Sequence, residues 1–294
     1  MTTETATDTV NALACSPEFA RDGLCFAACN SGLRRSDDGG ASWQDAYESL
    51  ALAAPLGATS VALSPAFGRD RTVFAGASGG VLRSGDGGAT WQIITLPEPA
   101  PLVMALAVSP NFASDGLVFA GTMEDGVFRS GDGGRTWAAW NFGLTDPCVL
   151  ALAVSPNFVR DQTLFAGTSS GVFRSTNTGA TFTQVSVGNG STTGLPAGTA
   201  FDLAGDPTNQ ARLFTGLVAA AGSGGQNGIY RSTNTGATWT RVSNATMNAL
   251  ITTATSNIEI AVGNNNNVYA AIVNSGALAG LFRSGDGGTT WTRL

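Results

Sequence analysis

The chain consists of short apolar segments separated by polar turns, and this pattern recurs along its length. Residues 149–174 read VLALAVSPNFVRDQTLFAGTSSGVFR, and residues 103–129 read VMALAVSPNFASDGLVFAGTMEDGVFR. A related segment, VNALACSPEFARDGLCFAACNSGLRR, begins at Val10. Each copy holds three apolar segments of strand length bounded by Gly, Pro, Asn or Asp, and no window shows a long helical period. The pattern therefore predicts three consecutive β-strands, a, b and c, in each copy.

A fourth strand, d, begins at the aromatic residue that ends a second motif. This motif reads RSGDGGRTW at residues 129–137, and its six copies are 45 to 57 residues apart. That spacing matches one four-stranded propeller blade. The sequence therefore predicts an all-β fold, a six-bladed β-propeller with four antiparallel strands per blade. We expect a single domain over residues 1–294 with blades at about 9–50, 58–97, 102–145, 148–190, 199–244 and 257–294.

The second motif has a physical interpretation as a turn between strands c and d. A short carboxylate can accept backbone N–H groups within its own turn, glycine reaches positive φ without strain, and a large aromatic residue can pack between blades. Asn and Phe in some copies can make the same contacts, which favours a structural turn over six catalytic acids. The motif residues are Ser36, Asp38, Gly40, Trp43, Ser84, Asp86, Gly88, Trp91, Ser130, Asp132, Gly134, Trp137, Ser175, Asn177, Gly179, Phe182, Ser232, Asn234, Gly236, Trp239, Ser284, Asp286, Gly288 and Trp291.

The pattern S-x-D-x-G-x-[ST]-W resembles the Asp-box, or BNR, repeat. Similar repeats occur in sialidases, two-domain xyloglucanases, sortilin-type receptors and photosystem II assembly propellers. The resemblance covers essentially the whole chain and implies the propeller fold. It does not imply one function, because propellers with this box include enzymes, receptors and assembly factors.

The charged residues exclude several classes of function. All 15 basic residues are arginine, and the chain has no histidine. Ser-His-Asp and Cys-His catalysis, histidine metal ligands and Schiff-base lysines are therefore excluded. A net charge of -6 argues against a nucleic-acid partner. No segment has the length of a membrane helix, so we expect no direct membrane insertion. The N-terminal residues lack the features of a signal peptide, which predicts a cytoplasmic protein, or an extracytoplasmic one if a signal has been removed.

Strand order assigns the loops to two faces. The a–b loops and the boxes share one face, the bottom, and the b–c and d–a connections share the other, the top. Long top connections at 186–199, 219–227, 244–257 and 274–280 gather in or beside repeats 5 and 6, either as a binding face or as divergence without function. No arginine lies in a top loop. We expect an acidic top that binds a protein or a glycan, with the candidates Glu48, Glu98, Glu124, Asp125 and Asp146.

Strand a carries one pair of unusual acids. Asp202 and Glu259 occupy a position that is Ala or Ser in the other four repeats. Two carboxylates near the channel could act as general acid and as nucleophile or base on a glycoside, or bind a cation. The favoured interpretation is that each is solvated or hydrogen-bonds a neighbouring loop. A sialidase is disfavoured, because no arginine cluster is available to hold a substrate carboxylate.

The four cysteines do not form a zinc motif, because no histidine or further Cys pair completes one. Cys15 and Cys25 flank one hairpin loop, so a disulfide between them is one interpretation. Small buried thiols are the favoured interpretation, because these residues replace Val and Leu of the other repeats.

The sequence thus predicts a non-catalytic β-propeller that acts as a protein-interaction, scaffold or assembly module, with no cofactor and no metal. The alternative is a glycoside hydrolase that uses Asp202 and Glu259, or a lectin-like propeller that binds glycans through the top of blades 5 and 6. Whether the protein is an enzyme stays open at this point.

Overall fold

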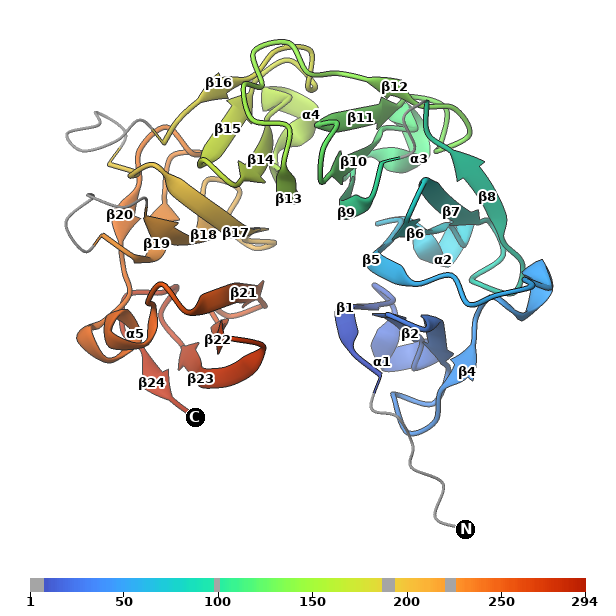
Figure 1. The fold of residues 1–294 in the computed structure, drawn as a ribbon, viewed down its shortest axis with the longest axis horizontal. Helices are drawn as coiled ribbons and strands as arrows, with labels where there is room; N and C mark the ends of the chain where they lie inside the picture. The colour runs from blue at the N-terminus through green and yellow to red at the C-terminus, as the bar shows by residue number, and fades with distance from the viewer. Residues whose placement is uncertain (1–7, 98–100, 187–193, 220–225) are drawn as a thin grey trace. The chain divides into compact units, whose positions relative to one another are not determined.

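The structure is a computed structural model that describes residues 8–97, 101–186, 194–219 and 226–294. It contains six separate four-stranded antiparallel sheets, and in each sheet the strands follow one another in chain order (Figure 1). The predicted fold class, a six-bladed β-propeller, is confirmed. The chain divides into two compact units, one ending at Ala139 and one beginning at Trp140, with three blades in each. Among the described residues, no helix is long and apolar enough to cross a membrane.

The first unit contains blades 1 to 3. Blade 1 comprises β1 (Val10–Cys15), α1 (Phe19–Asp22), β2 (Cys25–Cys29), β3 (Gly32–Ser36) and β4 (Gln44–Asp45), followed by the 3-10 helix η1 (Glu48–Leu50). Blade 2 comprises β5 (Ala58–Leu63), α2 (Phe67–Asp70), β6 (Val73–Ala77), β7 (Gly80–Ser84) and β8 (Gln92–Thr95). Blade 3 comprises β9 (Val103–Val108), α3 (Phe112–Asp115), β10 (Val118–Thr122), β11 (Val127–Ser130) and β12 (Ala138–Ala139).

The second unit contains blades 4 to 6. Blade 4 comprises β13 (Val149–Val154), α4 (Phe158–Asp161), β14 (Leu164–Thr168), β15 (Val172–Ser175) and β16 (Thr183–Gln184). Blade 5 comprises β17 (Gly198–Gly205), β18 (Leu213–Ala219), β19 (Gly228–Ser232) and β20 (Thr240–Arg241). The helix α5 (Ala245–Leu250) precedes blade 6, which comprises β21 (Thr255–Val262), β22 (Val268–Asn274), β23 (Ala277–Ser284) and β24 (Thr292–Arg293).

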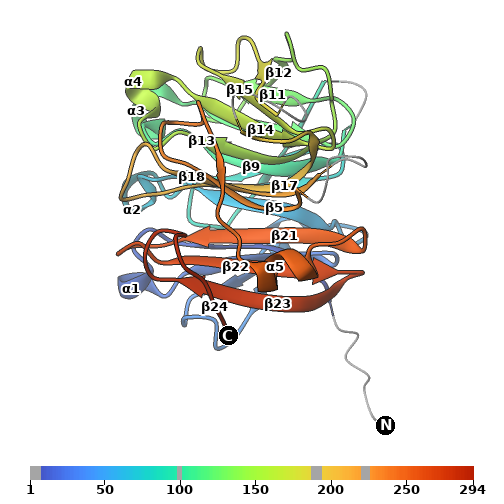
Figure 2. The same ribbon diagram turned by 90° about the vertical axis from the view of Figure 1, so that its left-hand side faces the viewer.

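Two of the connections predicted as long loops are ordered elements. Residues 244–257 include α5, whose first turn is capped by the Asn244 side chain accepting the N–H of Met247 at 3.0 Å, and α5 lies beside β23 (Figure 2). Residues 274–280 form a hairpin in which Asn274 pairs with Ala277. Ser275 and Gly276 both have positive φ, the geometry of a two-residue hairpin turn that matches strand twist. The extra residues therefore lengthen the strands of blade 6 and do not form a loop.

The a–b loops of the first four blades share one hydrogen-bonded structure. In blade 3, the hydroxyl of Ser109 donates to Asp115 at 2.6 Å, and the other carboxylate oxygen of Asp115 accepts the N–H of Leu117 at 2.9 Å. This pair closes the loop around a single helical turn that ends at Gly116 in the left-handed region. The carbonyl of Gly116 then accepts the N–H of Gly133 in the box of the same blade. The a–b loop and the box are thereby joined at one end of the blade.

The box itself is a compact network around one buried serine. In blade 3 the hydroxyl of Ser130 donates to Asp132 at 2.8 Å and accepts the N–H of Gly134 at 2.9 Å. Asp132 also accepts the N–H and the hydroxyl of Thr136, at 2.9 and 2.7 Å. Although desolvation acts in the opposite direction, these bonds lower the pKa of Asp132 to about 2. In blades 4 and 5 the side-chain oxygens of Asn177 and Asn234 accept the corresponding threonine N–H, which explains why Asn can replace Asp.

The box also packs against the preceding blade of its own unit. Trp91 meets Phe26 edge to face with ring centroids 6.3 Å apart, and Trp239 meets Phe165 with the same separation. At Gly288 a Cβ atom would lie 2.6 Å from Phe214, and the residue has a φ of +81°. Glycine is therefore required for both its backbone angle and its lack of a side chain. The box aromatics of blades 2 to 6 are buried, whereas Trp43 is 40% exposed.

We expect Gly288→Ala to destabilise the protein by about 2 to 4 kcal/mol, because it combines overpacking with a strained positive φ. The matched control is Gly285→Ala in the same box, where a Cβ would meet nothing within 4 Å. Urea denaturation of both variants measures the difference. Equal free energies of unfolding would show that the contact between Gly288 and Phe214 does not constrain the box.

Candidate functional site

Asp202 and Glu259 lie on the first strands of two consecutive blades in the second unit. Asp202 pairs with Gly216 on the neighbouring strand, and Glu259 pairs with Ala271. Each strand has a register shift, between Ala200 and Asp202 in β17 and between Thr255 and Asn257, two residues before Glu259, in β21. The first strands of the other four blades have a similar shift, so this bulge belongs to the repeat and does not single out the two acids.

The Asp202 carboxylate joins the two blades through backbone donors. It accepts the N–H of Ile260 on β21 at 2.6 Å and the N–H of Leu203 on its own strand at 2.7 Å. Because β21 is an edge strand of its sheet, N–H groups along its outer side have no strand partner. Asp202 supplies one of them with an acceptor. Asp202 therefore has a structural role, and any catalytic role would have to be compatible with this hydrogen bond.

The same environment changes the acidity of Asp202. Burial raises the pKa of Asp202 to about 7, and the nearby charge of Glu259 adds to this shift, while the two backbone donors oppose it. Glu259 is exposed, and its carboxylate accepts a hydrogen bond from the Asn257 amide at 2.6 Å. The structure therefore brings the two acids close enough for their charges to interact. A carboxyl with a raised pKa close to a second carboxyl is the arrangement that glycoside hydrolysis uses.

A metal site is a separate possibility for such a pair. Within the part of the chain that the structure describes, no group of three or more His, Cys, Asp or Glu residues is placed to hold a metal ion. Among the described residues, Asp202 and Glu259 thus have no third His, Cys, Asp or Glu beside them that could complete a metal site.

The five acids expected on the top have different surroundings. Glu98 lies outside the described residues. Glu124 and Asp125 lie in the loop between β10 and β11, and Glu48 is exposed at the start of η1. Asp146 instead has a local structural contact, since it accepts hydrogen bonds from Ser169 and from the N–H groups of Ser170 and Cys148. These bonds outweigh desolvation and lower the pKa of Asp146.

Glu48 borders a pocket of about 430 Å³ at the top end of blade 1. The pocket is lined by Arg34, Asp45 and Tyr47 and by residues 51–56, which read ALAAPL. Tyr47 is 4% exposed, and its hydroxyl has no hydrogen-bond partner. Its ring is fixed edge to face against Trp91 with centroids 5.7 Å apart, and burial raises the pKa of its hydroxyl. Sequence reasoning missed this pocket, although the apolar d–a connection is a usable signal.

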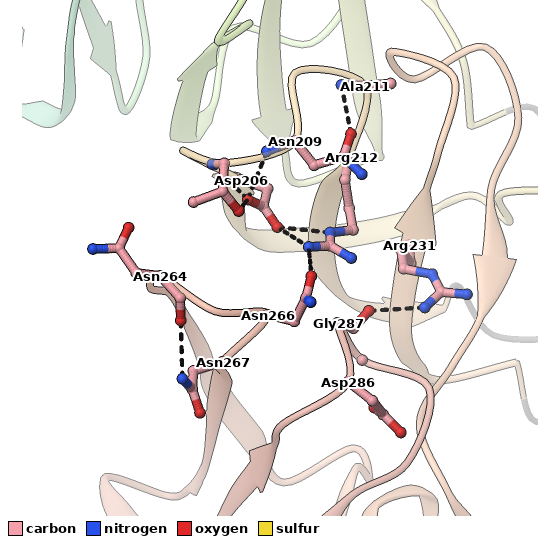
Figure 3. A network of polar contacts seen from close by, with 12 residues as sticks. Asp206, Asn209, Ala211, Arg212, Arg231, Asn264, Asn266, Asn267, Asp286 and Gly287 are labelled. Atoms are coloured by element: carbon pink, nitrogen blue, oxygen red, sulfur yellow. Dashed lines mark hydrogen bonds and ion pairs between the residues drawn. The ribbon is translucent and has the colours of Figure 1, made fainter.

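A buried ion pair replaces the serine–aspartate pair of the a–b loop in blade 5. Asp206 is fully buried and accepts Nε of Arg212 at 2.6 Å, and the guanidinium also donates to Asn266 of blade 6 (Figure 3). Asp206 further accepts the N–H of Thr208 at 2.8 Å. Although burial acts in the opposite direction, these bonds and the charge of Arg212 lower the pKa of Asp206. Since the carboxylate is occupied by protein donors, this network is a structural element of the bottom end of blades 5 and 6.

Known structures resemble this chain in fold. No protein-family model matches the sequence, and no curated protein matches it. The GH74 xyloglucanase from Xanthomonas campestris has a TM-score of 0.70 at 18% identity over 98% of this chain. A GH74 enzyme from Niastella koreensis has a TM-score of 0.68 at 19% identity over 97% of this chain. The chain spans 45% of the length of each of these two enzymes.

A second group of similar structures is closer to this chain in length. YCF48 from Cyanidioschyzon merolae has a TM-score of 0.63 at 16% identity, with 98% of this chain and 85% of that chain covered. A structure of YCF48 bound to D1 peptide has a TM-score of 0.65 at 19% identity, with 81% of that chain covered. This chain has the fold of the GH74 and YCF48 propellers. At these identities the likeness establishes the fold alone.

The shifted acidity of Asp202 predicts a pH-dependent stability. An aspartate has a pKa near 3.9 in an unfolded chain, so the folded state, with its pKa of about 7, binds more protons between these values. The free energy of unfolding should therefore fall as pH rises through this window, with a slope of at most about 1.4 kcal/mol per pH unit from this group. Asp202→Asn should remove this contribution.

Urea denaturation between pH 4.5 and 8 measures the slope. The wild type and Asp202→Asn are compared with Glu124→Gln, which removes an exposed top-loop charge and should retain the wild-type slope. Identical slopes in the wild type and Asp202→Asn would contradict the raised pKa of Asp202.

Proposed function

We propose that the chain is a non-catalytic β-propeller that binds a protein partner, as an interaction or assembly module. The observation that carries this proposal is the pocket at the top end of blade 1. It combines the exposed carboxylates of Asp45 and Glu48 with the exposed apolar residues of segment 51–56. The lining of this pocket is divided between polar side chains, among them Arg34, Asp45 and Glu48, and the apolar segment 51–56.

The chemistry of the pocket favours a basic, partly apolar peptide segment. The carboxylates of Asp45 and Glu48 outnumber the single guanidinium of Arg34, which donates to the Ser31 hydroxyl. A lysine or arginine side chain can lay its aliphatic stem along Leu52 and neighbouring apolar residues and place its charge near the carboxylates. The YCF48 structure with D1 peptide supports the idea that a propeller of this fold and similar size can bind a peptide.

A peptide array tests this proposal. The purified chain should bind peptides that combine basic and apolar residues in preference to acidic ones, and binding should weaken with added salt. The double variant Asp45→Asn/Glu48→Gln should lower the affinity at least about tenfold, roughly 1.4 kcal/mol. The control is Glu18→Gln, which removes a half-buried charge, paired with Arg21, from the a–b loop at the other end of the same blade.

Two results would count against this proposal. One is unchanged affinity in the double variant. The other is a native extract in which the protein occurs only as a free monomer.

A glycoside hydrolase is the second candidate, and the raised pKa of Asp202 is the observation that favours it. Asp202 would serve as general acid, and Glu259 as nucleophile or base. The similarity to GH74 enzymes supports testing xyloglucan among other β-glucans. Turnover that Asp202→Asn or Glu259→Gln abolishes, with Glu124→Gln unaffected, would establish this activity. Binding of a glycan without turnover would instead indicate a lectin-like propeller, and neither binding nor turnover on a broad panel would exclude both.

A further inference from the structure

Cys15 and Cys25 are direct cross-strand partners in blade 1. Cys15 is the last residue of β1, Cys25 is the first residue of β2, and the two are paired in register. The N–H of Ser16 donates to the carbonyl of Leu24 at 2.9 Å, which makes the adjacent pair a hydrogen-bonded one. Because the two kinds of pair alternate, Cys15 and Cys25 form a non-hydrogen-bonded pair, in which Cα atoms lie about 4.5 Å apart. That separation lies within the range that a disulfide spans.

Blade 1 differs from the other blades at both positions of this pair. The equivalent partners are apolar in four blades, and in blade 5 a glycine faces a leucine. The pairs are Leu63 with Val73, Val108 with Val118, Val154 with Leu164, Val262 with Val268, and Gly205 with Leu213. The joint occurrence of two cysteines at one pair of facing positions points to a bond between them.

We propose that Cys15 and Cys25 are a redox-sensitive site that forms an intramolecular disulfide across the first two strands of blade 1. The bond closes the loop of residues 16–24, which carries α1. The carbonyl of Gly23 in this loop accepts the N–H of Gly39 in the box of the same blade. Oxidation therefore secures the bottom end of blade 1 against local opening, since a cross-link restricts the unfolded chain.

The reaction requires an oxidant, and a small-molecule disulfide such as oxidised glutathione supplies it by two exchange steps. The thiolate of exposed Cys15 attacks one sulfur of oxidised glutathione, forming a mixed disulfide and releasing one glutathione thiolate. The thiolate of buried Cys25 then attacks the Cys15 sulfur and releases the second glutathione. The two protein thiols lose two protons and two electrons, and one oxidised glutathione becomes two reduced ones. Burial raises the pKa of Cys15, and Cys25 adds to this shift, so the first step should accelerate with rising pH.

The remaining cysteine of blade 1 is a natural control. Cys29 lies four residues beyond Cys25 on the same strand, about 13 Å away, and the structure pairs it with Val10 and Gly32. A disulfide between Cys15 and Cys29 would therefore require the strands to separate.

Peptide mapping of the full chain tests the proposal. The reduced, folded protein is incubated at several ratios of oxidised to reduced glutathione, alkylated and digested with trypsin under non-reducing conditions. Cleavage after Arg21 separates Cys15 from Cys25, so the peptides 1–21 and 22–34 remain joined only if a disulfide links them. Cys29→Ser assigns the link, because it should leave the cross-link intact while Cys25→Val abolishes it. In Cys25→Val the reaction should stop at a mixed disulfide of Cys15 with glutathione.

A second measurement excludes an artefact of unfolding. Oxidation should raise the thermal midpoint of the wild type and of Cys29→Ser, and it should leave Cys15→Val/Cys25→Val unchanged. That double variant restores the apolar pair found in other blades, so it is expected to fold. The proposal is overturned if Cys15 and Cys25 stay reduced in excess oxidised glutathione, if the cross-link joins Cys15 to Cys29, or if it forms only in urea.

Discussion

The hydrogen-bonded serine at the centre of each box is the constraint on which the blades depend. Its hydroxyl donates to the Asp or Asn two residues later and accepts the glycine N–H four residues later. These bonds fix the turn between strands c and d, and the turn presents its glycine to a phenylalanine of the preceding blade in the same unit, as Gly88 and Phe26 illustrate. A local network of short polar contacts thereby sets the packing of large apolar groups between blades.

This construction gives the two ends of a blade different chemical characters. At the bottom end, the polar side chains of the box and of the a–b loop are largely occupied by contacts within the blade or with the next blade of the same unit. Blade 5 keeps this arrangement with different residues, because the Asp206–Arg212 pair takes over from serine and aspartate. At the top end, the connections vary in length and composition. The pocket beside Tyr47 lies at this end, and its exposed carboxylates and apolar residues make it a candidate recognition site.

The carboxyl group of Asp202 both links two strands and has a raised pKa. Its backbone donors favour the ionised form, while burial and the charge of Glu259 favour the protonated form, and the balance raises its pKa. The bond from Ile260 ties β17 to β21. The packing of the two blades is enough to explain the raised pKa of Asp202. Turnover of a substrate would distinguish a catalytic carboxyl from a structural one.

The sequence by itself determined the fold class, the strand order and the box residues, because the same local hydrogen bonds and apolar contacts recur in every blade and leave a period in the chain. Only the tertiary structure decided which irregular residues meet. It placed Glu259 near Asp202 and paired Cys15 with Cys25 across two strands. It also showed that Asp146 accepts hydrogen bonds from its own region, and it formed the pocket beside Tyr47 from strand residues and the connection at 51–56. It also showed that residues 274–280 lengthen a hairpin. These features depend on register, burial and contacts between distant segments, which occur once in the molecule and therefore leave no repeating signal.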